Sequence, residues 1–380
     1  MSLGARIEAE LRGDRTIWMI IAVLSMFSIV AVYSASGWEA WRSRDGDTTA
    51  FLVKHMVIIA FGLVMIYLCH LLHYLQYKRM APVLIVVVIP LLMATLAFGR
   101  NINDASRWLS VGGVSIQPSE FAKLALIIYL ARELTRRQEY ITSFRDAFMP
   151  LLVPVVIICG LIAPANLSTA AVLFATSITL MFIGRVSWKY IFLLGMMGIV
   201  VLALLIAVGK LYPDSGFVRL DTWISRIDEF ANASDGGYQV QQAKIAIARG
   251  GIFGQGPGNS IIRNFLPYAH ADFIYAIICE EYGLLGGTII LFLYTLLFFR
   301  SVKMVSRSPK AFGAFLSIGL SLMLTVQALA NMAVNVNLVP ATGLTLPLIS
   351  MGGTSILFTC VSFGIILSVS KYIESLEYSS

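Results

Sequence analysis

A short run of the sequence, His270-Ala271-Asp272, places a carboxylate where a long polar segment meets an apolar, span-like run. An Asp at such a place is often only a helix cap. At the rim of a membrane, desolvation raises the pKa of a carboxyl group and nearby cations lower it. Asp272 is therefore a candidate general base that takes a proton from a substrate hydroxyl, with His270 beside it.

Glu120 and Lys123 lie at the start of another apolar run, where a charge costs roughly 2.5–3.5 kcal/mol on membrane-insertion scales. Their spacing places them on one helix face, where they can pair. Two interpretations stay open: a structural ion pair that faces the interior, or an outward-opening polar cavity in which Lys123 holds an anion. Lys54, near the start of a further run, is expected to snorkel to the interface.

Arg107-Trp108 lies just before the run Gln117-Pro118-Ser119-Glu120. Trp is common at membrane interfaces, where it anchors the chain. The Arg guanidinium is suited to bidentate contact with phosphate. This dipeptide is therefore a candidate contact for a substrate that carries phosphate.

The composition requires a membrane around these residues. Of the 380 residues, 58% are hydrophobic and 13% are charged, and the mean hydropathy is +0.81. A soluble domain is about 45–50% apolar and about 25% charged, so this chain lacks the polar surface to cover itself. Its four cysteines lie in apolar runs without metal-ligand spacing, and we expect buried packing thiols.

An all-α, polytopic membrane domain is predicted over residues 1–380, because backbone polar groups in lipid must be satisfied within helices. About ten spans are expected, at residues 16–34, 51–72, 81–99, 119–132, 147–163, 168–184, 188–209, 272–299, 311–334 and 346–370. Sixteen of the 28 Lys and Arg residues fall on one side and four in short loops on the other. The positive-inside rule therefore predicts cytoplasmic N- and C-termini, and explains the net charge of +7 without nucleic acid.

This orientation makes residues 210–271 one long external loop between the seventh and eighth spans, and such loops are usually functional. The loop contains an amphipathic stretch from Tyr238 to Ala248. The last external segment, 335–355, has two prolines at membrane depth, which is tolerated only against protein or a cavity. We expect a broken, re-entrant segment that lines a cavity, although close helix packing explains its small residues equally well.

Three motifs follow one another on the predicted outer side. They are Asp104-Ala105-Ser106-Arg107-Trp108 with Gln117-Pro118-Ser119-Glu120-Phe121-Ala122-Lys123, then Leu266-Pro267-Tyr268-Ala269-His270-Ala271-Asp272 with Glu280-Glu281-Tyr282-Gly283, then Pro340 through Ser355. These motifs resemble those of the SEDS family, which includes FtsW, RodA and SpoVE. The resemblance covers nearly the whole chain. Four positions depart from the family pattern: Asp104 replaces Gly, Ala271 replaces Thr, Met351 replaces Tyr, and Asn166 stands where Asp is frequent.

The resemblance implies a peptidoglycan glycosyltransferase that acts on lipid II, a disaccharide-pentapeptide on undecaprenyl pyrophosphate. The 4-hydroxyl of one unit would attack the anomeric carbon of the other glycan, with inversion and loss of pyrophosphate, and Asp272 would be the base. The residues expected to contact the substrate are Arg107, Trp108, Glu120, Lys123, His270, Lys54, Ser350 and Ser355. The sequence assigns no protein metal site. The resemblance allows a divalent cation, Mg or Mn, to assist the loss of pyrophosphate, with Asp272 as a ligand.

The resemblance also implies a class B penicillin-binding protein and other division proteins as partners, in the cytoplasmic (inner) membrane at the division septum. The end of the first span, Tyr33-Ser34-Ala35-Ser36, is more similar to the division member of the family than to the elongation (RodA-type) member. A lipid II flippase and a non-catalytic scaffold are the alternatives. A transporter should carry polar residues at the midplane and on both faces, whereas here they gather on the outer side.

Overall fold

The computed structural model describes residues 12–37, 48–102, 105–111, 114–211, 220–232 and 237–377. Helices occupy all ten predicted span positions: α2 (Arg15–Ala35), α4 (Thr49–Leu71), α5 (Leu75–Phe98), α6 (Pro118–Arg136), α7 (Met149–Ile162), α8 (Leu167–Ile183), α9 (Trp188–Leu211), α12 (Ile274–Arg307), α13 (Ala311–Asn335) and α14 (Gly353–Glu377). Among the described residues, seven helices are long and apolar enough to cross a membrane, α7 being counted with the π-helical turn Phe144–Phe148. The predicted polytopic helical fold is confirmed, while the number of ten spans stays a prediction.

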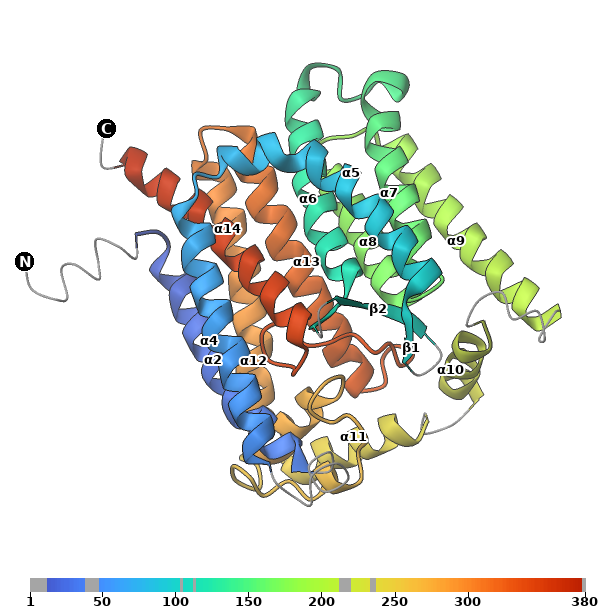
Figure 1. Cartoon of the computed structure of the whole chain (residues 1–380), viewed down its shortest axis with the longest axis vertical. Coiled ribbons are helices and arrows are strands. Elements are labelled where there is room, and N and C mark those ends of the chain that lie inside the picture. The colour runs from blue at the N-terminus through green and yellow to red at the C-terminus, as the bar shows by residue number, and fades with distance from the viewer. Residues whose placement is uncertain are drawn as a thin grey trace, which may run out of the picture.

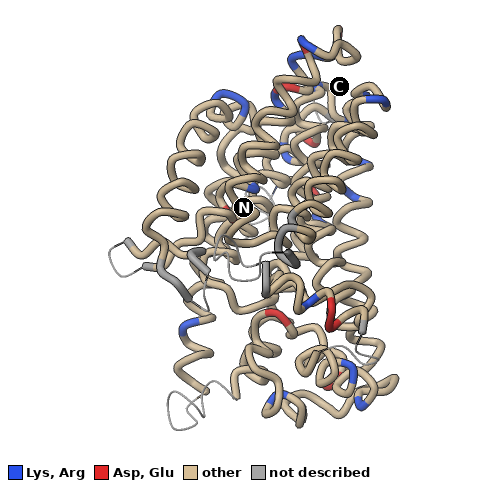
Figure 2. The backbone as a smooth tube through the Cα atoms, turned by 90° about the vertical axis from the view of Figure 1, so that its right-hand side faces the viewer, with Lys and Arg blue, Asp and Glu red and all other residues tan. Residues whose placement is uncertain are grey.

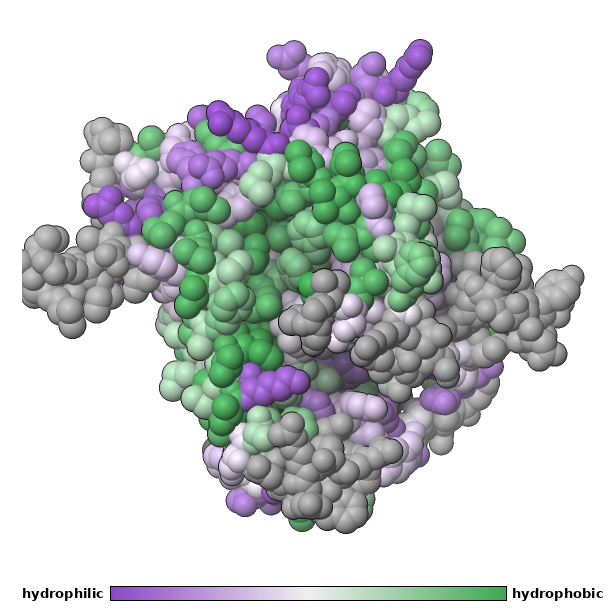
Figure 3. Space-filling view, viewed as in Figure 1, coloured by the Kyte–Doolittle hydropathy of each residue, from purple (hydrophilic) through white to green (hydrophobic). Residues whose placement is uncertain are grey.

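The bundle is organised around α13, which contacts α6, α8, α12 and α14 (Figure 1). Helix α4 packs along α14, and their backbones approach closely because Gly62 of α4 faces Cys360 and Gly364 of α14 faces Ile66. Helices α5, α7 and α8 pack on the other flank of α6, and α9 packs on α8. Large apolar side chains remain exposed around the bundle and form a hydrophobic band (Figure 3), as expected for a surface that faces lipid. All four cysteines are buried and unpaired, as predicted.

Both ends of the described chain lie at the same end of the bundle. The backbone N–H groups of Gly13 and Asp14, just before α2, donate to Glu374 Oε2 at 2.6 Å and to Ser370 Oγ at 2.7 Å on α14. Figure 2 shows Lys and Arg gathered towards this end. The placement of both termini on one side is therefore confirmed, and that this side is cytoplasmic stays a prediction from the positive-inside rule.

Residues 100–118 fold further than the loop that the sequence suggests. They form a three-stranded antiparallel sheet of β1 (Arg100–Ile102), β2 (Ala105–Val111) and β3 (Val114–Ile116), in that order. The register pairs Arg100 with Trp108 and Leu109 with Ile116. The sequence analysis did not predict these strands, because strands of three to seven residues are too short for periodicity to detect. The dipeptide Gly112-Gly113 between β2 and β3 was the available hairpin signal.

The long segment after α9 carries two helices at the end of the molecule opposite the termini (Figure 1): α10 (Leu220–Asn232) and α11 (Tyr238–Gly250). Helix α11 confirms the predicted amphipathic stretch and packs on α12. A small separate core holds it there, built from Ala35, Val240, Ala243, Ala246, Ile262, Leu266, Ala269, Phe273, Ala276, Ile277 and Val334.

Glu280 and Glu281 tie this segment to α12. Glu280 is fully buried and accepts from Ser260 Oγ at 2.5 Å and from the Ile261 and Ile262 N–H groups at 3.2 and 3.3 Å, and it pairs with Arg249 at 3.2 Å. Glu281 is also buried and accepts from the hydroxyl of Ser34 on α2. The two carboxylates therefore fasten the long segment against the spanning helices.

Gly283 breaks α12 just after these carboxylates, with φ 69°. A Cβ there would overlap the Ile252 carbonyl and the Gly254 N–H. We expect Gly283→Ala to destabilise the fold by roughly 2–4 kcal/mol, through left-handed strain and overpacking. Gly195→Ala on α9 is the matched control, because no atom lies within 4 Å of its added methyl group. Thermal unfolding in detergent checks this, and equal midpoints for the two variants would contradict it.

Candidate functional site

Glu120 and Lys123 are brought together in the first two turns of α6, which begins at Pro118. Pro fits this position because its missing N–H would have no helical partner there. Lys123 Nζ lies 2.9 Å from Glu120 Oε1, and the two residues are 3% and 7% exposed. The predicted pairing is confirmed, and the pair faces the interior of the bundle.

A ring of hydrogen bonds connects this ion pair to the segment between α13 and α14. Lys123 Nζ donates to Gln327 Oε1 at 2.7 Å, and Gln327 Nε2 donates to the Thr345 carbonyl at 2.9 Å. Thr345 Oγ1 lies 3.1 Å from Ser355 Oγ, which in turn donates to Glu120 Oε2 at 3.4 Å. An adjoining cavity of about 10 Å³ has room for about one water molecule. Both charges are thus satisfied by protein groups, as burial requires.

Residues 336–352 follow a non-helical path through the protein, as predicted for a re-entrant segment. Leu344, Leu346, Leu348 and Ile349 are buried. The Ile349 carbonyl accepts from Ser28 Oγ at 2.8 Å. Irregular backbone at this depth is possible because protein groups satisfy it.

This re-entrant segment also holds the turn that carries Asp272. Ser350 Oγ donates to the Ala271 carbonyl at 2.5 Å, and Met351 N–H donates to the His270 carbonyl at 2.9 Å. From α13, Asn331 Nδ2 donates to the Asp272 carbonyl at 2.7 Å and to the Leu344 carbonyl at 2.7 Å. The backbone of the turn is therefore fixed from two sides.

The Asp272 side chain is half-buried at the start of α12. Its Oδ2 would lie 3.5 Å from a Cβ built on Gly343, so the carboxylate faces the re-entrant segment. Phe273, and not Asp272, is the N-cap residue of α12, which has no side-chain cap. Asp272 therefore precedes the N-cap position, and its role as the proton acceptor stays a prediction.

The structure adds residues that the sequence analysis did not single out. Gln327, Asn331 and Asn335 follow one another at intervals of four along α13 and are all buried. Gln327 binds Lys123 and Asn331 binds the Asp272 turn, one helical turn or about 6 Å apart along the axis. The sequence did contain a signal for these residues, because three amide side chains at helical spacing form a polar stripe in an otherwise apolar run.

His270 is half-buried, and a second histidine, His55, lies on α4. His55 is fully buried, and its Nε2 lies 2.8 Å from Ser28 Oγ. The sequence analysis passed over His55 because a lone His in an apolar run carries no spacing signal.

Three candidates lie outside this network. Lys54 is exposed on α4, in agreement with a snorkelling side chain. Trp108 is half-buried on β2, which contacts α5 and α6. Arg107 lies on the same strand, but its side chain is outside the described part of the structure, so its phosphate contact stays a prediction.

The described residues contain no group of three or more His, Cys, Asp or Glu side chains that could hold a metal ion. A divalent cation with Asp272 as one ligand therefore stays a prediction. In Figure 3 the surface is hollowed below the apolar band, and hydrophilic atoms line part of that hollow.

Comparisons with known proteins agree with this arrangement. Residues 14–375 match the family of cell cycle proteins that groups FtsW, RodA and SpoVE. The chain is 33% identical over 376 residues to stage V sporulation protein E of Bacillus subtilis, covering 94% of this chain and 97% of that protein. It is 36% identical over 368 residues to the probable peptidoglycan glycosyltransferase FtsW of Alkalilimnicola ehrlichii, covering 94% and 89%. A chain of a peptidoglycan synthase complex, solved to explain the coordination of polymerization and crosslinking, superposes with a TM-score of 0.73 at 26% identity, covering 95% and 98%.

Proposed function

The chain belongs to the family of cell cycle proteins that groups FtsW, RodA and SpoVE, and from this premise we propose that it is a peptidoglycan glycosyltransferase that polymerises lipid II. The site would lie on the outer face of the cytoplasmic membrane. The observation that carries the proposal is the half-buried Asp272 carboxylate, on a turn fixed by Asn331, Ser350 and Met351.

In the proposed reaction, Asp272 takes the proton from the 4-hydroxyl of the acceptor glycan. That oxygen attacks the anomeric carbon of the donor glycan from the face opposite the pyrophosphate. The bond from the carbon to the pyrophosphate oxygen breaks, and its electron pair leaves with undecaprenyl pyrophosphate. One displacement inverts the α-linked donor to a β-linked product, so a single base suffices.

The leaving pyrophosphate needs positive charge. The proposed substrate contacts from the outer side are Arg107 and Trp108 on β2, Lys54 on α4, and His270. Four of the expected substrate contacts are buried: Glu120, Lys123, Ser350 and Ser355. We therefore propose that they hold the site in shape from within the bundle and do not contact the substrate. A divalent cation would be held mainly by substrate phosphates, as Mg²⁺ commonly is, with Asp272 as its one carboxylate.

We further propose that the protein works at the division septum with a class B penicillin-binding protein. The synthase complex that superposes on this chain couples polymerization to crosslinking, which supports a crosslinking partner. The relative named FtsW and the ending Tyr33-Ser34-Ala35-Ser36 favour division over elongation.

Purified full-length chain with its penicillin-binding protein tests the proposal, with fluorescent lipid II as substrate. We expect glycan polymer that lysozyme digests. A parallel vesicle assay measures accessibility of labelled lipid II to an external quencher. Translocation without polymer would instead assign the chain to lipid II transport.

Asn331 should act as a positioning residue for Asp272. Asn331→Leu removes the Asn331 donor from the buried Leu344 carbonyl, at a cost of about 1–3 kcal/mol. It also removes the shorter of two donors to the Asp272 carbonyl, which keeps only Asn335 Nδ2 at 3.4 Å. We expect polymerisation to fall roughly tenfold, which corresponds to about 1.4 kcal/mol, with lipid II binding unchanged. Ser321→Ala on the same helix is the control, because its hydroxyl donates only to the Ile318 carbonyl one turn away. Equal rates in the two variants would contradict this role.

A further inference from the structure

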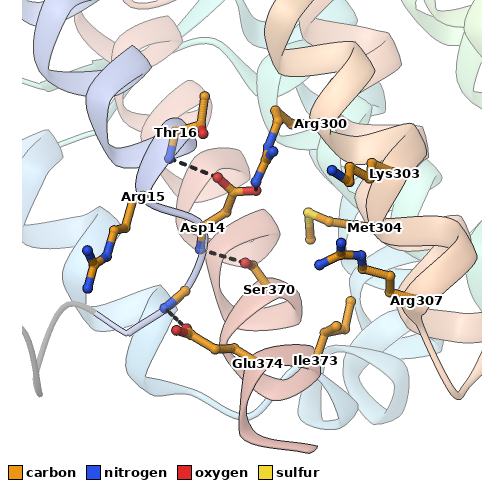
Figure 4. Close-up of a pocket in the computed structure, with 11 residues that line it drawn as sticks. Asp14, Arg15, Thr16, Arg300, Lys303, Met304, Arg307, Ser370, Ile373 and Glu374 are labelled. Atoms are coloured by element: carbon orange, nitrogen blue, oxygen red, sulfur yellow. Dashed lines mark hydrogen bonds and ion pairs between the residues drawn. The ribbon is translucent and has the colours of Figure 1, made fainter. Parts of the chain in front are cut away.

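A cavity of about 280 Å³ lies at the opposite end of the bundle from Asp272, where the start of α2 meets the ends of α12 and α14 (Figure 4). Its lining is rich in charge. The cations are Arg15, Arg300, Lys303 and Arg307, and the carboxylates are Asp14 and Glu374. Cations therefore exceed carboxylates by two in this cavity, at the end of the molecule that the Lys and Arg distribution assigns to the cytoplasm.

Both carboxylates are already engaged in the fold. Asp14 caps α2 by accepting from Thr16 N–H at 2.8 Å and pairs with Arg300, whose Nε lies 2.7 Å from Oδ2. Glu374 accepts from Gly13 N–H at 2.6 Å. The two carboxylates thus join the start of α2 to α12 and α14. Four cations against two carboxylates leave the lining with an excess of positive charge.

Lys303 and Arg307 stand one turn apart on α12, on the wall that faces Asp14 and Ser370 (Figure 4). Both are exposed, and the Lys303 ammonium has no hydrogen-bond or ion-pair partner within the described ranges. Across the cavity, Ser370 Oγ accepts from Asp14 N–H and can donate its own hydrogen. Two exposed cations opposite a hydroxyl donor complement the oxygens of a phosphate group.

The surroundings of the cavity distinguish a lipid phosphate from a dissolved one. Phe299 and Val302, on the turn of α12 beside Lys303, are 62% and 41% exposed. Such side chains would lie against acyl chains at the edge of the bilayer. Basic anchors at helix ends are common in membrane proteins, but these converge on a cavity between helices, an arrangement that binds anionic headgroups. We propose that this cavity binds the phosphate of an anionic phospholipid of the inner leaflet.

The test uses the full chain in phosphatidylcholine nanodiscs, with and without phosphatidylglycerol. The double variant Lys303→Gln with Arg307→Gln removes the two cations of the α12 wall. Arg136→Gln with Lys189→Gln is the matched control, because it removes one Arg and one Lys that are exposed at the same end but do not line the cavity. Native mass spectrometry counts retained phosphatidylglycerol, and thermal unfolding measures its stabilising effect.

We expect the cavity variant to bind phosphatidylglycerol about tenfold more weakly, since each cation near an anionic headgroup contributes substantially to its attraction. The control pair should bind as the unaltered chain does. Equal losses in both pairs would overturn the proposal in favour of a diffuse surface charge. Protection by inorganic phosphate at the same concentration as the lipid would overturn the lipid assignment. Equal unfolding midpoints of all variants in phosphatidylcholine alone verify that folding is intact.

Discussion

Asp272→Asn is expected to reduce glycan polymerisation from lipid II by about 10²–10⁴-fold, the range contributed by a positioned general base. The amide keeps the size of the side chain and cannot accept the proton of the acceptor hydroxyl. The backbone of the turn should stay in place, because Asn331, Ser350 and Met351 bind main-chain carbonyls of residues 270–272. Polymer length on gels and the rate of lipid II consumption measure the effect.

Asp228→Asn provides the matched control for this variant. Asp228 lies on α10, in the same long external segment, and the exchange removes the same charge. We expect the control to polymerise as the unaltered chain does, and both variants to unfold at the same temperature and to bind the penicillin-binding protein. Undiminished polymer formation by Asp272→Asn would contradict the role of Asp272 as the base. Equal losses in the two variants would mean that the negative charge of this part of the molecule matters, and not the position of Asp272.

The position of Asp272 could be predicted because two independent signals met there. A polar segment re-enters an apolar run at this residue, and the motif around it resembles a known family. What holds the residue could not be predicted, because it depends on contacts between positions far apart in the sequence. Asn331 reaches Asp272 across 59 positions and Ser350 reaches Ala271 across 79.

The helices themselves followed from composition, since apolar runs of sufficient length must be helical in lipid. Boundaries moved by several residues, as in α12, which continues to Arg307 beyond the predicted end at 299. The β1–β3 sheet escaped detection because polar loops and short amphipathic strands have similar composition. Gly283 could be recognised within a motif, but its φ of 69° depends on the close passage of residues 252–254.

The burial of Glu120 and Lys123 distinguishes between two interpretations that the sequence left open, a structural ion pair and a substrate contact. Spacing alone allowed Lys123 either to pair with Glu120 or to hold a substrate anion. In the structure Lys123 is 3% exposed and bonded to both Glu120 and Gln327. A direct substrate contact would require this ring to open, so the structure favours support of the site from behind.

Lys123→Met is accordingly expected to destabilise the protein by about 3–5 kcal/mol, because it leaves the buried Glu120 without its counter-ion. Adding Glu120→Gln should recover most of that loss, since a neutral pair needs no compensation and can keep the Ser355 contact. Lys54→Met is the matched control, because the same exchange on an exposed side chain of α4 should cost little. Thermal unfolding of the unaltered chain, Lys123→Met, Glu120→Gln and the double variant in one detergent gives the coupling between the two sites.

A double variant as unstable as Lys123→Met would contradict the structural role of the pair. If the double variant folds, its polymerisation rate shows whether the ion pair contacts the substrate or only supports the site. Substantial activity means that the pair supports the re-entrant segment through Thr345 and Ser355, as the hydrogen-bond ring indicates. A folded but inactive double variant would mean that the Lys123 ammonium leaves Glu120 during the reaction and meets the pyrophosphate itself.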